Sequence, residues 1–218
     1  MAILPEAQDK EWMPKSAWLM RHESFVQRTK SQLDTQVVFL GDSITEGWTG
    51  AGKPPWVTEF ERPFNCLNLG IGGDEVQHVH WRIINGEGDG TNPAVVSILA
   101  GTNNIGNAGH DPADVIVAIG KLADAAAEKW PNAKILMHTI FPRDEKPSGQ
   151  REKIEVINKQ IRDWGNAGRF ELLDMYEIFL EEDGTLPKTL MPDFLHLSEK
   201  AYVIWASKLK VKLDELMA

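Results

Sequence analysis

Residues 35–47 read Thr-Gln-Val-Val-Phe-Leu-Gly-Asp-Ser-Ile-Thr-Glu-Gly, and this stretch decides the fold. Its first part, Thr35–Leu40, is rich in β-branched and apolar residues, which predicts a strand that is covered on both faces. Its second part brings a glycine, an aspartate and a serine, residues that commonly form turns and begin helices. A buried strand that turns directly into a helix is typical of the α/β class.

Four further apolar runs predict the rest of a sheet. They are Asn65–Leu69, Pro93–Leu99, Ala133–His138 and Arg169–Asp174. Helical stretches separate them: residues 14–33, a stretch that begins at Asp111-Pro112 and stops at Pro131, residues 154–164 and residues 201–216. Strands that alternate with helices form parallel sheets through right-handed crossovers. We therefore expect a three-layer α/β/α sandwich with about five parallel strands, as one domain over residues 1–218, with residues 1–34 as a helical segment packed on it.

The composition narrows the possible functions. The chain has 218 residues, a net charge of −9 and one cysteine, which allows no internal disulfide. An acidic chain is a poor partner for the phosphates of nucleic acids, so we expect no nucleic-acid partner. The sequence contains no run of 18 apolar residues, so it predicts no membrane span. The first residues lack the basic and apolar regions of a signal peptide, which favours a cytoplasmic location, with secretion as the alternative if a signal peptide was removed.

Reactive residue types follow the predicted strands. Ser43 follows the first strand, Gly73 the second and Asn103 the third, while Asp193 and His196 precede the last helix. Each alone has an ordinary structural reading: a helix cap, a tight turn, a turn asparagine and a helix-start hydrogen bond. In parallel sheets, however, ligands bind outside the carboxyl ends of the strands. Together these residues supply a nucleophile, a base with its orienting carboxylate, and donors for an oxyanion.

These blocks resemble those of the SGNH (GDSL-type) hydrolases, whose fold is flavodoxin-like. The matching segments are Gly41-Asp-Ser-Ile44, Gly73-Asp74, Gly101-Thr-Asn-Asn104 and Asp193-Phe-Leu-His196. Within that family the chain is most similar to the catalytic subunits of the platelet-activating factor acetylhydrolase IB branch. The segments that carry this likeness are Asn68–Asp74, His78–Arg82, Pro142–Pro147 and Asp193–Leu197. Their order and spacing are more specific than any one block.

The resemblance implies a role for each matching residue. Ser43 is the nucleophile, His196 the general base, and Asp193 the residue that orients His196. The backbone N–H groups of Ser43 and Gly73 and the side-chain amide of Asn103 form the oxyanion hole. Ile44, Thr102 and Leu195 flank the acyl group, which favours a short acyl chain, acetyl first. The resemblance implies no metal and no organic cofactor, and a homodimer is possible because the branch forms dimers.

A Gly/Pro-rich stretch from Trp48 to Trp56 departs from the branch pattern. We expect it to be a loop beside Ser43, in which Trp48 contacts the substrate. The leading hypothesis is a serine esterase that hydrolyses short acyl esters of small molecules, with acetyl as the expected acyl group. A carbohydrate O-acetylesterase is the alternative, since tryptophan offers sugars a stacking surface. A non-catalytic interaction module is an alternative of another class, because a fold does not fix a function.

Overall fold

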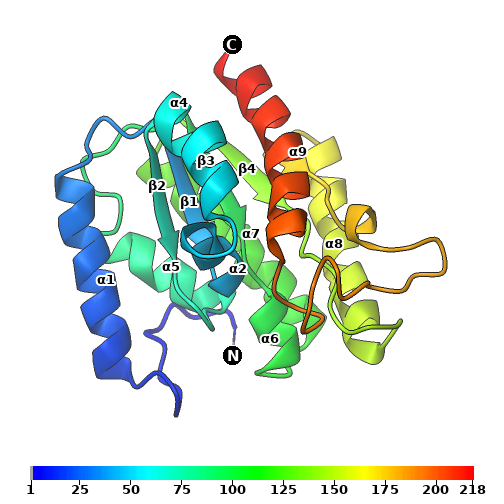
Figure 1. Ribbon diagram of the computed structural model, residues 1–218. Helices are drawn as coiled ribbons and strands as arrows, with labels where there is room; N and C mark the ends of the chain where they lie inside the picture. The colour runs from blue at the N-terminus through cyan, green and yellow to red at the C-terminus, as the bar shows by residue number, and fades with distance from the viewer. Residues whose placement is uncertain (1) are drawn as a thin grey trace.

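A parallel sheet of five strands forms the middle layer of the computed structural model, which describes residues 2–218 (Figure 1). The strands are β1 (Val37–Gly41), β2 (Cys66–Gly70), β3 (Val95–Leu99), β4 (Lys134–His138) and β5 (Glu171–Leu173). Their order is β2-β1-β3-β4-β5, and every pair is parallel. The predicted α/β/α sandwich is thus confirmed, and each predicted strand lies within two residues of its observed bounds.

Successive strand residues face opposite helical layers. Val38 and Leu40 of β1 join one apolar core, whereas Val37 and Phe39 join the other. The first core is covered by α1 (Lys15–Lys30), α5 (Val76–Ile84), α7 (Pro112–Lys129) and α8 (Gly149–Asn166). The second is covered by α9 (Glu199–Met217), on the opposite side of the sheet from α1 in Figure 1. Burial on both faces explains why the strands read as continuous apolar runs.

Short helical turns complete the structure. They are α2 (Ser43–Glu46), η1 (Gly47–Thr49), α3 (Lys53–Pro55), η2 (Trp56–Glu61), α4 (Arg62–Phe64), α6 (Thr102–Gly106) and η3 (Glu177–Phe179). The prediction of a loop from Trp48 to Trp56 is therefore wrong, because most of this stretch is helical. Pro54 and Pro55 fit since the first turn of a helix needs no N–H from its residues.

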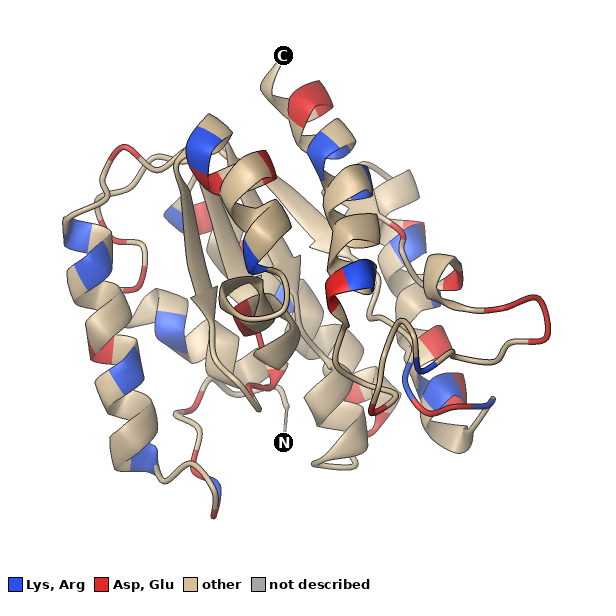
Figure 2. Ribbon diagram, in the orientation of Figure 1, with Lys and Arg blue, Asp and Glu red and all other residues tan. Residues whose placement is uncertain are grey.

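Charged residues of both signs are spread along the outer helices. Figure 2 shows basic and acidic residues interspersed along α1, α8 and α9 on the face in view. Among residues 2–218, no helix combines the length and the apolar character needed to cross a bilayer.

Candidate active site

The carboxyl ends of β1, β2 and β3 bring three of the predicted site segments to one edge of the sheet. Ser43 begins α2 two residues after β1, Gly73 lies in the turn after β2, and Asn103 lies in α6 after β3. The strand order reverses direction between β1 and β3, which is the point where parallel α/β sheets bind ligands. The topology therefore assembles these residues although they are up to 60 positions apart.

Ser43, His196 and Asp193 form a chain of short contacts. Ser43 Oγ lies 2.9 Å from His196 Nε2, and His196 Nδ1 lies 2.7 Å from Asp193 Oδ2. The other oxygen of Asp193 accepts hydrogen bonds from the backbone N–H groups of Leu195 (3.1 Å) and His196 (2.7 Å). The carboxylate thus holds both the ring and the backbone of His196, which fixes the direction in which the ring presents Nε2 to the serine.

The hydrogen bonds that Asp193 accepts keep its carboxyl group ionised. Burial raises its pKa, but the hydrogen bonds from the side chain and backbone of His196 outweigh this effect and hold the pKa below its usual value. The pair is open to solvent, since the side chains of His196 and Asp193 are 48% and 56% exposed. Ser43, which contacts His196, is itself partly exposed.

Backbone and amide N–H groups lie around Ser43. Among residues 2–218, the N–H groups of Ser43 and Gly73 have no hydrogen-bond partner, so both can serve a ligand. Asn103 donates one amide hydrogen to the carbonyl of Asp74 (2.9 Å) and accepts a hydrogen bond from Asn107 (3.0 Å), which fixes its side chain. Gly73 adopts a φ of 77°, a left-handed conformation that favours glycine and turns its N–H away from the helical path.

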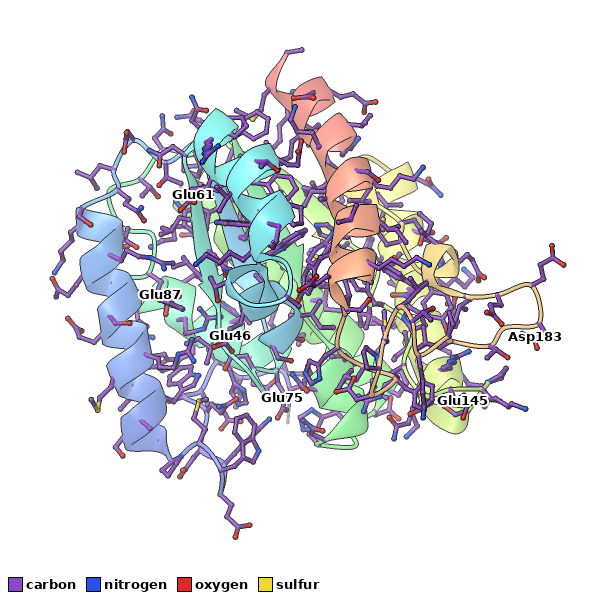
Figure 3. The ribbon with its side chains drawn as sticks, in the orientation of Figure 1. Glu46, Glu61, Glu75, Glu87, Glu145 and Asp183 are labelled. Carbon is purple, nitrogen blue, oxygen red and sulfur yellow. The ribbon has the colours of Figure 1, made fainter. Side chains whose placement is uncertain are left out.

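Two carboxylates brace the turn that carries Ser43. Asp42 caps α2, because its Oδ1 accepts the N–H of Ile44 at 2.9 Å, and burial raises the pKa of Asp42 to about 6. Glu46 accepts the N–H of Gly72 at 2.7 Å and pairs with Arg21 of α1 at 2.6 Å. Figure 3 shows Glu46 beside α2. These contacts join the serine turn to the glycine turn after β2.

A fully buried ion cluster lies behind the same turns. Arg82 of α5 contacts Asp74 at 2.8 Å and Glu87 at 2.5 Å, and it also donates to the carbonyl oxygens of Leu69 (2.7 Å) and Gly41 (3.0 Å). One guanidinium thus holds the ends of both β1 and β2. Glu75 and His78 form a capping box at the start of α5, and Asp74 faces inward toward Arg82.

The predicted acyl-flanking residues differ in their exposure. Ile44 and Thr102 are almost wholly buried, while Leu195 is partly exposed. Arg143 donates to the backbone oxygen (3.0 Å) and the side-chain oxygen (3.2 Å) of Thr102.

Trp48 does not line the site, and that prediction is wrong. Its side chain is 0% exposed and packs against Trp56, Phe60, Tyr202 and Trp205, with ring centroids 4.6–6.1 Å apart. The physical reason is that four neighbouring aromatic rings offer the indole far more apolar contact than an open cleft does.

Sequence reasoning missed the N-terminal arm, residues 6–13. Lys10 Nζ donates to the carbonyl oxygen of Gly73 at 2.6 Å, and Trp12 lies so close that a Cβ on Gly73 would come within 2.4 Å of its ring. No motif could have shown this, because the arm reaches Gly73 through a contact 63 positions away along the chain.

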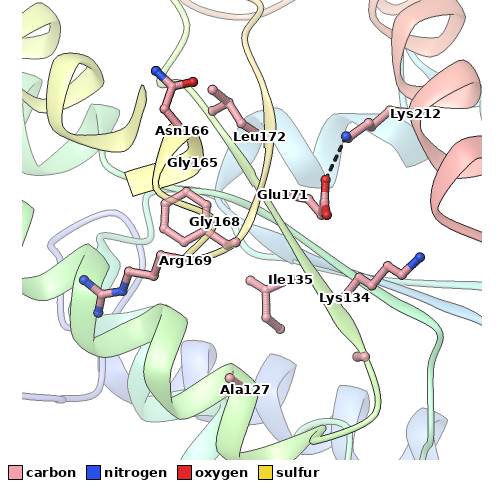
Figure 4. A pocket seen from close by; sticks show the side chains of 12 residues that line it. Ala127, Lys134, Ile135, Gly165, Asn166, Gly168, Arg169, Glu171, Leu172 and Lys212 are labelled. Carbon is pink, nitrogen blue, oxygen red and sulfur yellow. Dashed lines mark hydrogen bonds and ion pairs between the residues drawn. The ribbon is translucent and has the colours of Figure 1, made fainter. Parts of the chain in front are cut away.

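A separate hollow of about 470 Å³ lies at the opposite end of the strands. It is lined by the beginnings of β4 and β5, among them Lys134 and Glu171, and by the end of α8 (Figure 4). An ion pair of 2.8 Å between Lys212 and Glu171 borders it. Because Ser43 follows the carboxyl end of a strand, this hollow is not part of its site.

Comparison with known proteins agrees with the fold and shows the family. Residues 39–204 match the GDSL-like lipase/acylhydrolase family. The chain is 34% identical over 209 residues to subunit alpha1 of human platelet-activating factor acetylhydrolase IB. The aligned region covers 92% of this chain and 84% of that subunit. It is 34% identical over 208 residues to subunit alpha2 of that enzyme from Gallus gallus, covering 92% and 85%.

Solved structures share the same fold. A GDSL-like lipase from Bacteroides thetaiotaomicron superposes with a TM-score of 0.77 at 20% identity, over 89% of this chain and 97% of that one. A carbohydrate esterase of family 3 from Talaromyces cellulolyticus gives 0.62 at 20% identity, over 84% and 97%. The family match and the relatives lead to one conclusion: the chain belongs to the GDSL-like lipase/acylhydrolase family and is an ester-hydrolysing enzyme.

Proposed function

We propose that this enzyme is a serine esterase for short acyl esters, with Ser43 as the nucleophile. The observation that carries the proposal is the contact of 2.9 Å between Ser43 Oγ and His196 Nε2, together with the contact of 2.7 Å between His196 Nδ1 and Asp193. A hydroxyl is a weak nucleophile unless a base removes its proton as it attacks. His196 is placed to do so, and the carboxylate of Asp193 stabilises the imidazolium that forms.

The reaction then follows from the donors around Ser43. As Ser43 Oγ bonds to the carbonyl carbon, the carbonyl oxygen gains negative charge, which the N–H groups of Ser43 and Gly73 and the amide of Asn103 can stabilise. His196 returns the proton to the departing alcohol, which leaves an acyl group on Ser43. Water, deprotonated by His196, next attacks this acyl group and releases the carboxylic acid and free Ser43.

A short acyl group fits the surroundings best. Ile44 and Thr102 are nearly buried, so the space beside Ser43 suits an acetyl group better than a long chain. The relatives named acetylhydrolases support the same choice. We therefore expect p-nitrophenyl acetate to be hydrolysed at least about tenfold more efficiently than the octanoate ester. Preference for octanoate would overturn the acyl-length proposal and leave the mechanism intact.

The nucleophile is tested by Ser43→Ala. This variant should lose on the order of 10⁴-fold or more in kcat with p-nitrophenyl acetate, and it should not react with a fluorophosphonate probe. Ser97→Ala is the matched control, because Ser97 Oγ also lies 2.8 Å from a histidine, Nε2 of His138, but both residues are buried. Labelling of Ser43→Ala, or undiminished turnover, would overturn the proposal.

A further inference from the structure

Trp12 is an unusual tryptophan in this chain. Its side chain is 61% exposed, whereas Trp18, Trp48, Trp130 and Trp205 are at most 2% exposed. An indole that stays in water gives up the stabilisation that burial of its large apolar surface would bring. Five of the other seven tryptophans are buried and Trp81 and Trp164 are partly exposed, so Trp12 is the one mostly exposed indole among residues 2–218, which points to a role at the surface.

The arm that carries Trp12 is firmly held. Lys10 and Met13 exchange backbone hydrogen bonds of 3.1 and 3.0 Å, which closes a turn around Glu11 and Trp12. Lys10 also pairs with Glu75 at 3.0 Å, where both side chains are largely buried, and it donates to the carbonyl oxygen of Gly73 at 2.6 Å. The turn that carries the indole is thus held in place, so Trp12 contacts a ligand with little loss of backbone freedom.

The indole lies directly against the oxyanion-hole turn. A Cβ on Gly73 would come within 2.4 Å of both Cζ2 and Cη2 of Trp12, so the ring edge touches the backbone whose N–H faces the proposed oxyanion. An ester bound at Ser43 therefore has Trp12 as a neighbour. The buried acyl-flanking residues leave the alcohol half of the ester as the part that extends toward the open surface.

A polar hollow of about 430 Å³ adjoins Trp12. Lys10, Glu11, Trp12, Glu75, Asn107 and Ala108 line it. Asn107 also donates to the side chain of Asn103 at 3.0 Å, so the hollow meets the oxyanion donors on a second side. Its volume lies within the range of about 300–1,000 Å³ that is usual for ligand sites. Figure 3 shows Glu75 at the edge where the strands end.

The lining of this hollow favours a ring with several hydroxyl groups. One flat aromatic face offers contact to the C–H groups of a sugar ring, and the carboxylates, ammonium and amide offer hydrogen bonds to hydroxyls. An alkyl chain would meet only Trp12 and Ala108 as apolar partners. A quaternary ammonium group would face the carboxylate of Glu11 but also the ammonium of Lys10, which lies 3.0 Å from Glu75.

We propose that Trp12 and the adjoining polar hollow form the subsite for the alcohol half of the substrate, and that this alcohol is a cyclic polyol such as a sugar. The proposal rests on the proposed esterase function, because it assigns the leaving group of that reaction. It makes Trp12 a residue that determines specificity by contacting the substrate.

The experiment compares Trp12→Ala with Trp12→Phe on two acetyl esters. One is acetylated xylose, and the other is ethyl acetate, whose small alcohol offers no ring to stack. The kcat/KM for acetylated xylose relative to that for ethyl acetate should fall about tenfold in Trp12→Ala, which is the size of one lost aromatic contact. The change should appear as a higher KM for the sugar ester. Trp12→Phe should recover most of the ratio. Met20→Ala removes an exposed apolar side chain from α1 and should change neither value.

Binding without turnover gives an independent result. Ser43→Ala should bind acetylated xylose in a calorimeter, and Ser43→Ala with Trp12→Ala should bind it about tenfold more weakly. An unchanged ratio in Trp12→Ala, or an equal fall in kcat for both esters, would overturn the subsite. A Trp12-dependent preference for an acetylated ether phospholipid over the sugar would overturn the polyol. If Ser43→Ala still hydrolyses ethyl acetate, it is instead the proposed esterase mechanism that fails.

Discussion

At the scale of single residues, His196 owes its position to the turn that precedes it. Asp193 accepts two backbone hydrogen bonds and one ring contact within three residues, and Phe194 adopts a left-handed φ of 60° to make this possible. The contact between Asp193 and His196 is therefore local, which is why their spacing in the sequence predicts it. Ser43 lies 153 positions from His196, so their contact follows only from the topology of the sheet.

Asp193→Asn tests the carboxylate at this scale. The variant can still accept a hydrogen bond, but it loses the negative charge that stabilises the imidazolium, so kcat should fall by roughly 10²–10⁴-fold while KM changes little. Asp183→Asn is the matched control, because Asp183 also accepts the N–H of the residue two positions on, at 2.9 Å, in a loop that Figure 3 shows far from Glu46 of α2. Equal kcat values for the two variants would show that the Asp193 charge has no catalytic role.

At the scale of elements, the strands and long helices could be predicted well and the short helices could not. Four buried apolar runs, a fifth that is partly exposed, and clear caps such as Asp111 at the start of α7 mark the long elements. The stretch from Trp48 to Trp56 misleads because glycine and proline suggest a loop, whereas Trp48 packs against α9 and Trp56 packs against Trp48. The packing partners, Tyr202 and Trp205, lie about 150 residues away, so no local pattern reveals them. The docking of Trp12 beside Gly73 is hidden for the same reason.

Tyr202 links α9 to the turn that carries Ser43, which makes Tyr202→Phe a test of this coupling. The hydroxyl donates to the carbonyl oxygen of Ile44 at 2.7 Å in a buried place, and phenylalanine keeps the ring packing while it loses that bond. The free energy of unfolding should fall by about 1–3 kcal/mol, since a buried carbonyl is left without its donor. Urea unfolding measures this change.

Tyr176→Phe provides the comparison for Tyr202→Phe. Among the described residues, no hydrogen bond from the Tyr176 hydroxyl is found, although its ring is buried. Its removal should change the free energy of unfolding by no more than about 0.5 kcal/mol. If both variants lose the same amount, the contact with Ile44 contributes nothing particular to stability.

At the scale of the whole molecule, ionisable groups inside the two cores connect stability to pH. His138 of β4 lies between Ser97 and the ring of Trp205, and burial lowers its pKa to about 3. His78 of α5 belongs to the other core layer, where burial lowers its pKa to about 4 although Glu75 opposes the shift. Both histidines are therefore neutral in the folded protein at pH values where an unfolded chain would already bind protons.

The lowered pKa of His138 makes the free energy of unfolding fall as the pH falls. Above about pH 6.5 a histidine is neutral in both states, so it adds no pH dependence. As the pH falls from about 6.5 toward 3, only the unfolded chain gains the proton, and the folded state loses about 1.4 kcal/mol per pH unit. At pH 5 the loss from His138 alone is therefore about 2 kcal/mol relative to pH 7. Burial raises the pKa of Asp74 to about 7, so its carboxyl group has the opposite effect: it adds stability as the pH falls.

His138→Gln isolates this contribution, because Asp74 and His78 are present in both proteins and cancel in the comparison. Glutamine does not titrate, so the free energy of unfolding of the variant should decline less between pH 7 and pH 5 than that of the wild type, by about 2 kcal/mol. Urea unfolding at several pH values measures both curves, and a lower stability of the variant at pH 7 does not affect the difference in slope. Parallel curves for the two proteins would show that His138 takes up its proton as readily in the folded core as in the unfolded chain.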